Sequence, residues 1–259
     1  MRILLWAECQ KLRRSNILLL TVFATVFIAV IVFIGGKTTV DGVNFVESNG
    51  WYMATTLTWA TLFILPAMIA LMGSYMICRE EKDDTIKYLR LIPISETRLA
   101  AAKMIVTFTL SMLIYLMLFL LTLVTEAVLH LSALSAKIIF DYLKMYLVQG
   151  AGIFFAVSPI IAIVPYMKKS YWLAMLLAEI YSFSGLFMSM SNLLKTFYPI
   201  TAVFGVSGYY DTTLQNRIYS SVVLLLCGCL AACLLVGLNH RRRFGLRLPG
   251  RQNRLMSNG

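Results

Sequence analysis

The chain has 259 residues, of which 59% are hydrophobic and only 14% are charged. Soluble domains carry about 25% charged residues, so this composition excludes an ordinary soluble protein and indicates an integral membrane protein. The net charge of +11 comes from basic residues that flank apolar runs. This placement favours contact with anionic lipid headgroups, and we do not expect nucleic-acid binding.

Six apolar runs predict six membrane-spanning helices, because a bilayer core about 30 Å thick requires about 20 apolar residues in a helix. The predicted spans cover residues 17–35, 51–78, 99–129, 143–167, 171–194 and 218–238, and a basic tail follows over residues 239–259. We therefore expect an all-α membrane protein with a single transmembrane domain over residues 1–259.

The segment before the first span, RILLWAECQKLRRS, has apolar residues at helical spacing between basic residues. Two interpretations stay open, a helix that lies in the membrane interface or a simple extension of the first span. In the second span, Pro66 removes one helical hydrogen bond and predicts a kink. Residues 191–217 are semi-apolar and contain Pro199, Gly205 and Gly208, which predicts short interfacial or re-entrant helices.

Basic residues are divided unevenly between the two sides of the membrane. With six spans both termini lie on one side, and that side holds 18 of the 23 lysines and arginines. The other side holds Lys37, Lys137, Lys144, Lys195 and Arg217. Because lysine and arginine concentrate on the cytoplasmic side, we predict a multi-pass protein of the cell (plasma) membrane with both termini in the cytoplasm.

The densest cluster of charge, REEKDDTIKYLRLIP, lies between the second and third spans at residues 79–93. Ile86 and Leu89 share one face of a short predicted helix, which acidic residues precede and Pro93 ends. Acids and bases are equally numerous here, whereas membrane topology requires only bases. We therefore interpret the segment as a docking surface for another protein in preference to a solvated loop.

The sequence resembles the ABC-2 type permeases, the membrane subunits of ATP-binding-cassette exporters. The resemblance rests on the pattern of spans and on a motif of acidic residues, Thr, an apolar stretch, P-x-S and Lys. The matching residues are Glu80, Glu81, Thr85, Pro93, Ser95 and Lys103. Asp84 stands where the family usually has Gly, and Glu96 where it usually has a base. In size and style the chain is most similar to the lantibiotic-immunity and bacitracin-resistance branch.

The resemblance implies six transmembrane helices, an N-terminal interfacial helix and a short cytoplasmic coupling helix between helices 2 and 3. It implies a bacterial permease that expels a peptide antibiotic or similar amphiphile for self-immunity or resistance. It also implies two copies of a separate ATPase subunit, which would bind ATP and Mg²⁺, and a second permease chain, identical or sister. The ATPase-coupling residues would be Glu80, Glu81, Asp84, Thr85, Ile86, Leu89 and Pro93. The first alternative is an ABC exporter of a lipid, glycan or self-made peptide. Less favoured alternatives are an ATP-independent secondary transporter and an intramembrane enzyme.

No phosphate-binding loop of the form G-x-x-x-x-G-K-[ST], no catalytic motif and no Cys/His metal cluster occurs in the sequence. We therefore expect no catalytic residue, metal or cofactor in this chain. Glu179 lies well inside a predicted span, near Tyr181 and Ser182. A carboxylate at this depth costs about 2.5–3.5 kcal/mol, so Glu179 either lines a substrate path or permease interface or serves packing within the bundle. Glu126, near the end of the third span, is interpreted as interfacial.

Overall fold

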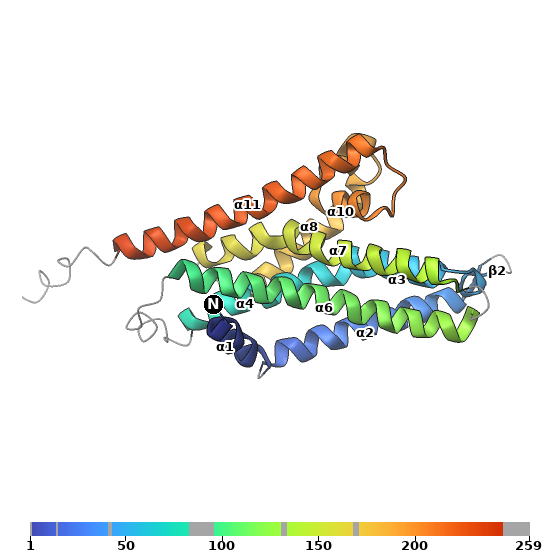
Figure 1. Cartoon of the computed structure of the whole chain (residues 1–259), viewed down its shortest axis with the longest axis horizontal. Helices are drawn as coiled ribbons and strands as arrows, with labels where there is room; N and C mark the ends of the chain where they lie inside the picture. Colours follow the sequence, from blue (N-terminus) through green and yellow to red (C-terminus); the bar gives the residue numbers. More distant parts are fainter. Residues whose placement is uncertain are drawn as a thin grey trace, which may run out of the picture.

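The computed structural model describes residues 2–13, 15–40, 43–82, 96–130, 134–167 and 171–245. These residues form a bundle of helices that run roughly along one axis (Figure 1). The elements are α1 (Arg2–Arg13), α2 (Asn16–Lys37), β1 (Thr39–Val40), β2 (Val43–Asn44), η1 (Phe45–Glu47), α3 (Trp51–Trp59), η2 (Ala60–Ile64), α4 (Leu65–Lys82), α6 (Glu96–His130), α7 (Ala136–Ile163), η4 (Val164–Met167), α8 (Trp172–Met188), α9 (Asn192–Phe197), α10 (Pro199–Ser207) and α11 (Leu214–Gly245). The two short strands pair antiparallel, with Val40 opposite Val43.

Within the described residues, five helical segments are long and apolar enough to cross a membrane. They are Asn16–Lys37, Trp51–Arg79, Arg98–His130, Ala136–Ile163 and Leu214–Gly237. The 17-residue helix α8 is apolar but shorter. Apart from the small hairpin the described chain is helical, so the predicted all-α class is confirmed.

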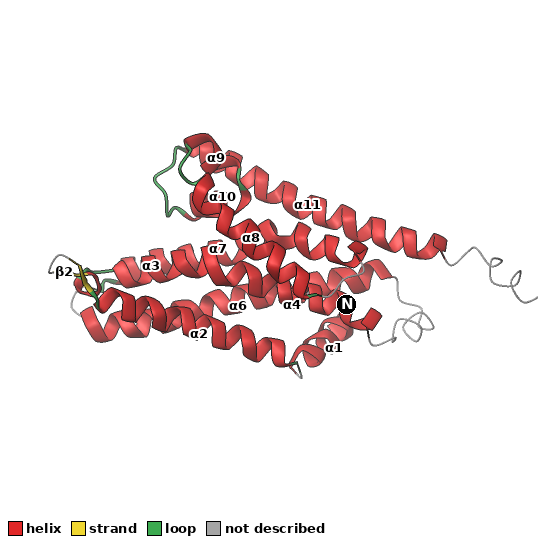
Figure 2. Ribbon diagram, turned by 180° about the vertical axis from the view of Figure 1, so that it is seen from behind, coloured by secondary structure: helices red, strands yellow, loops and turns green. Residues whose placement is uncertain are grey.

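The two ends of the bundle differ in what they carry. One end, here called the terminal end, holds α1, the last turn of α4, the first turn of α6 and the C-terminal part of α11 (Figure 1). The opposite end, here called the hairpin end, holds β1, β2 and the start of α3 (Figure 2). The chain bends between α1 and α2, where the Ser15 amide donates to the Leu12 carbonyl at 2.9 Å. Helix α1 is therefore separate from the first span, and its position in the membrane interface stays a prediction.

The most buried helices are the α3–η2–α4 segment and α7. Helix α7 packs against α6, α10 and α11, and α4 packs against α8. Leu65, Ile69, Ile153 and Ile161 are fully buried between them. By contrast, α2 and α11 leave many large apolar side chains exposed, which is the arrangement expected of peripheral helices whose outer faces contact lipid.

Two predicted boundaries differ from the structure. The fifth span, predicted over residues 171–194, ends as α8 at Met188, because the chain turns at residues 189–190, where the Met190 amide donates to the Phe187 carbonyl three residues earlier at 3.3 Å. The apolar residues Leu193 and Leu194 belong to α9 instead. The fourth span, predicted over residues 143–167, begins earlier, because Ser135 caps α7 by accepting a 3.3 Å hydrogen bond from the Ile138 amide.

The segment 191–217 contains the short helices that its sequence predicts. α9 and α10 lie beside α11 near the hairpin-end half of the bundle (Figure 2). The inward face of α10 is buried, including Ile200, Val203 and Phe204. Gly208 ends α10 with φ of 83°, a left-handed conformation that glycine adopts without steric cost. Whether these helices lie in the membrane interface stays a prediction.

Candidate functional site

The coupling residues predicted from the sequence lie only partly within the described residues. Glu80 and Glu81 belong to the last turn of α4, which ends at Lys82. The others, Asp84, Thr85, Ile86, Leu89 and Pro93, lie outside the described residues. The helices on either side of this segment, α4 and α6, end and begin at the terminal end of the bundle, beside α1 (Figure 1).

Helix α1 packs against α6 and is linked to the last part of α4 by a hydrogen bond close to the predicted coupling segment. Glu8 is buried, and its Oε1 lies 2.6 Å from Lys11 Nζ. The Arg79 guanidinium donates to the Lys11 backbone carbonyl at 3.0 Å and lies 5.5 Å from the centre of the Tyr75 ring. The bond from Arg79 to the Lys11 carbonyl thus links the end of α1 to the last part of α4, while the other two contacts lie within one helix each. Glu8 is the one acid in the basic segment RILLWAECQKLRRS, which is the sequence signal that could have marked it as a buried ion-pair partner.

The second span contains a π-helical segment, η2, immediately before Pro66. Proline has no amide hydrogen, so Pro66 donates neither to the Leu62 carbonyl four residues earlier nor to the Thr61 carbonyl five residues earlier. Ser182 of α8 supplies the missing donor, because its hydroxyl lies 2.7 Å from the Leu62 oxygen and 3.4 Å from the Thr61 oxygen. The predicted irregularity at Pro66 is thus a π-helical segment whose backbone is completed by a side chain from another helix.

A buried polar network extends from η2 through the centre of the bundle. Thr61 Oγ1 donates to Gln149 Oε1 at 2.8 Å and lies 3.0 Å from the Tyr115 hydroxyl oxygen. Gln149 Nε2 donates to Ser207 Oγ at 3.1 Å. Thr61, Tyr115 and Gln149 are fully buried. The network joins η2, α6, α7 and α10 through hydroxyl and amide groups, so it positions these helices relative to one another.

The three tentative residues of α8 serve different contacts. Ser182 completes the backbone of η2, as described above. Tyr181 lies against Tyr198, with ring centres 5.1 Å apart, and the Tyr198 hydroxyl donates to the Tyr181 carbonyl at 2.5 Å. Glu179 is half-buried, and its Oε2 has no hydrogen-bond partner among the described residues. Ser182 and Tyr181 thus make packing contacts within the bundle, and the assignment of the three residues to a substrate path or permease interface stays a prediction.

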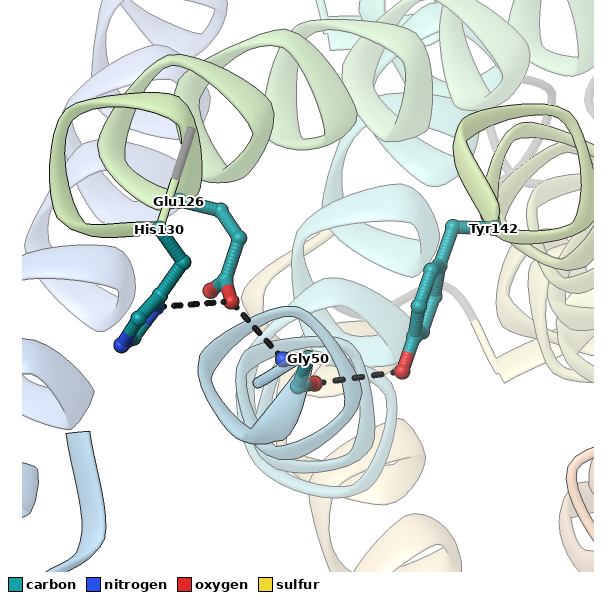
Figure 3. Close-up of polar contacts among 4 residues, drawn as sticks. All are labelled: Gly50, Glu126, His130 and Tyr142. Carbon is teal, nitrogen blue, oxygen red and sulfur yellow. Dashed lines mark hydrogen bonds and ion pairs between the residues drawn. The ribbon is translucent and has the colours of Figure 1, made fainter. Parts of the chain in front are cut away.

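Glu126 lies at the hairpin end of α6, and its side chain is buried within the bundle; its position at the membrane interface stays a prediction. The residue is only 1% exposed. Its Oε1 accepts a 2.7 Å hydrogen bond from the Gly50 amide and lies 3.2 Å from His130 Nδ1 (Figure 3). The Tyr142 hydroxyl donates to the Gly50 carbonyl at 3.1 Å. The start of α3 is thus held between α6 and α7 through both polar groups of one residue. The sequence could not show this, because the partners are 76 and 92 residues apart.

Comparison with known proteins decides the family. The sequence profile described as ABC-2 family transporter protein matches residues 4–185. The chain belongs to the ABC-2 transporter family. The match runs from α1 into α8, so it includes the π-helical segment, most of the central network and Glu126. The resemblance to ABC-2 permeases is therefore confirmed, and the protein is a membrane subunit of the ABC-2 permease type.

A curated relative of this ABC-2 permease is a bacitracin transport permease protein from Bacillus licheniformis. The two are 28% identical over 114 residues, which are 44% of this chain and 55% of the relative. The aligned region thus spans only about half the length of the relative.

Proposed function

We propose that this ABC-2 permease is the membrane subunit of an ATP-driven exporter that expels a peptide antibiotic or similar amphiphile from a bacterial cell membrane. The observation that carries the proposal is the family match over residues 4–185, together with the similarity to a permease whose name states bacitracin transport. Family membership implies association with a separate ABC ATPase, which would bind ATP and Mg²⁺. We further propose two ATPase subunits and a second permease chain, identical or sister, in the complete exporter.

A path of six crossings fits the arrangement of the helices. Helix α8 has 17 residues, which at about 1.5 Å per residue gives about 26 Å, close to the hydrocarbon thickness. It runs from the end of α7 back toward α9 and α10 (Figure 2). With α8 as a crossing, α1 and the C-terminal part of α11 share one side, as they share the terminal end of the bundle (Figure 1). The excess of lysine and arginine on that side supports its assignment to the cytoplasm.

Two apolar grooves support the proposal that the substrate is amphiphilic. A groove of about 330 Å³ lies between α6, α7 and α11, with Met104, Phe155 and Leu235 among its lining residues. A second groove, of about 390 Å³, lies between α2, α3 and α6 and includes Phe33 and Val128. Val128 is 82% exposed, so the second groove is accessible from the side of the bundle. Such grooves suit acyl chains or aliphatic side chains that arrive from the bilayer.

Coupling to the ATPase is tested on the segment between α4 and α6. We expect the double variant Ile86→Asp, Leu89→Asp to lose the ATPase, because burying each aliphatic side chain contributes about 1.5–3 kcal/mol. The variant Glu80→Lys is the matched control and should retain most of the ATPase, because an exposed ion pair contributes about 0–1 kcal/mol. The measurement is the ratio of ATPase to permease after co-purification from the native host. A full complement of ATPase on the double variant would exclude this segment as the docking site.

The substrate class is tested separately in a sensitive host. Expression of the permease with its ATPase should raise the inhibitory concentration of a bacitracin-like or lantibiotic peptide. Raised resistance without any ATPase would instead indicate a secondary transporter. Unchanged inhibitory concentrations for all such peptides, with the complex present in the membrane, would refute the proposed substrate class and leave export of a lipid, glycan or self-made peptide.

A further inference from the structure

A small pocket lies beside Glu126 at the hairpin end of the bundle. Its volume is about 170 Å³, enough for a group of several heavy atoms. The described residues that line it are Asn49, Gly50, Met53, Glu126, His130, Leu134, Ile138 and Tyr142. The lining residues come from the start of α3, the end of α6 and the beginning of α7, and from the residues just before α3 and α7. The helices of this end therefore enclose the pocket together.

One carboxylate oxygen on this pocket is unpartnered. Glu126 Oε1 is engaged by the Gly50 amide and lies close to His130, whereas Oε2 is buried and has no hydrogen-bond partner among the described residues (Figure 3). Among the described residues that line the pocket there is neither lysine nor arginine, and the basic side chain is that of His130. His130 Nδ1 lies within ion-pair distance of Oε1, but burial of Oε2 without a donor is energetically unfavourable, so this arrangement favours a bound molecule that donates a hydrogen bond to Oε2.

We propose that this pocket binds the primary ammonium group of an organic molecule. An ammonium group has three donors and no acceptor. Glu126 Oε2 is the acceptor without a partner, and the side chains of Asn49 and Tyr142, which also line the pocket, carry further oxygens. The Tyr142 hydroxyl lies across Gly50 from Glu126 (Figure 3). Met53, Leu134 and Ile138 supply an apolar wall for the carbon chain that carries the ammonium.

The composition of the pocket disfavours a metal ion as the cation. In the part of the chain that the structure describes, no three His, Cys, Asp or Glu side chains lie together as a metal-binding group. Calcium takes about six to eight oxygen ligands and structural zinc about four protein ligands, whereas Glu126 and His130 supply two strong ligands here. A quaternary ammonium is also disfavoured, because it has no N–H to donate to Oε2.

The experiment uses the full chain in nanodiscs and a butylammonium probe that carries a photoreactive diazirine. Irradiation should attach the probe to peptides that contain Met53, Leu134 or Ile138, located by mass spectrometry. Unlabelled butylammonium should compete, whereas tetramethylammonium and butanol should not. The competition is measured on the unmodified protein, so it does not depend on how well any variant folds.

Two variants give the matched comparison. Glu126→Gln keeps an oxygen for the Gly50 amide but removes the negative charge, and we expect labelling to fall about tenfold or more. Glu179→Gln removes a carboxylate of α8 that also has an unpartnered oxygen among the described residues but does not line this pocket, and it should leave labelling of these peptides unchanged. Equal labelling by a neutral alcohol probe, or undiminished labelling of correctly folded Glu126→Gln, would overturn the proposal.

The source of the ammonium is distinguished by the lipid composition. Phosphatidylethanolamine carries a primary ammonium and phosphatidylglycerol does not. Competition by phosphatidylethanolamine would support a lipid headgroup as the natural ligand. Strong labelling in both membranes, reduced by an amine-bearing peptide, would support the exported molecule, an assignment that rests on the proposed function. Binding of the probe requires neither ATPase nor transport, so failure of the pocket and failure of the export proposal give different results.

Discussion

The effects of substituting Ser182 and Pro66 on stability should be coupled. Pro66 leaves the Leu62 carbonyl without its backbone donor, and the Ser182 hydroxyl donates to that carbonyl instead. Ser182→Ala removes the 2.7 Å hydrogen bond to the Leu62 carbonyl. Hydrogen bonds between membrane helices contribute about 0.6 kcal/mol on average and at most about 1.7, while an unsatisfied buried group costs about 1–3 kcal/mol. We therefore expect the free energy of unfolding to fall by about 1–2 kcal/mol.

The decisive comparison is the same substitution in two backgrounds. In Pro66→Ala the new amide can donate to the Leu62 or Thr61 carbonyl, so removal of the Ser182 hydroxyl should then cost less than about 0.5 kcal/mol. The measurement is reversible unfolding in mixed micelles, followed by circular dichroism. A loss of 1 kcal/mol should lower the melting temperature by about 2–4 °C in a chain of this size.

Ser221→Ala is the control substitution. The Ser221 hydroxyl donates within α11 to the Arg217 carbonyl at 2.9 Å, and that carbonyl belongs to no proline-interrupted segment. We expect its free energy of unfolding to change by no more than about 0.5 kcal/mol in either background. If Ser182→Ala costs the same with and without Pro66, the hydroxyl does not replace the missing proline donor and the reasoning is wrong.

Two further predictions concern the centre of the bundle. Gly150→Ala should lower the free energy of unfolding by about 1–3 kcal/mol, because the new Cβ would lie 3.0 Å from the Tyr115 Cβ. Gly35→Ala is the control, because nothing lies within 4 Å of its new Cβ. Equal melting temperatures for the two variants would contradict the prediction. Thr61→Val should lower the free energy of unfolding by about 1–3 kcal/mol, because it leaves the Gln149 amide oxygen unsatisfied. In the Gln149→Leu background that oxygen is absent, so Thr61→Val should cost less there. A double-mutant cycle with no interaction energy would argue against the network.

The membrane helices could be predicted from the sequence because the bilayer imposes a local requirement. A span needs about 20 apolar residues with its backbone hydrogen bonds satisfied internally, and α2, α6 and α11 each meet this requirement within one continuous run. The family could be predicted for a related reason, since its motif lies in one short segment. The end of α8 was harder to predict, because Leu193 and Leu194 continue the apolar run while the chain already turns at Ser189.

The partners of the polar side chains could be decided only by the tertiary structure. The sequence places Pro66, Ser182 and Glu126 in or near spans, but it does not show which helix face meets which neighbour. Packing brings the Ser182 hydroxyl to a carbonyl 120 residues earlier and turns Glu126 toward the Gly50 amide. In a bilayer the hydrophobic effect does not choose between helix faces, because lipid chains are as apolar as leucine. Close packing and interhelical hydrogen bonds make that choice, and both depend on residues that are distant in the chain.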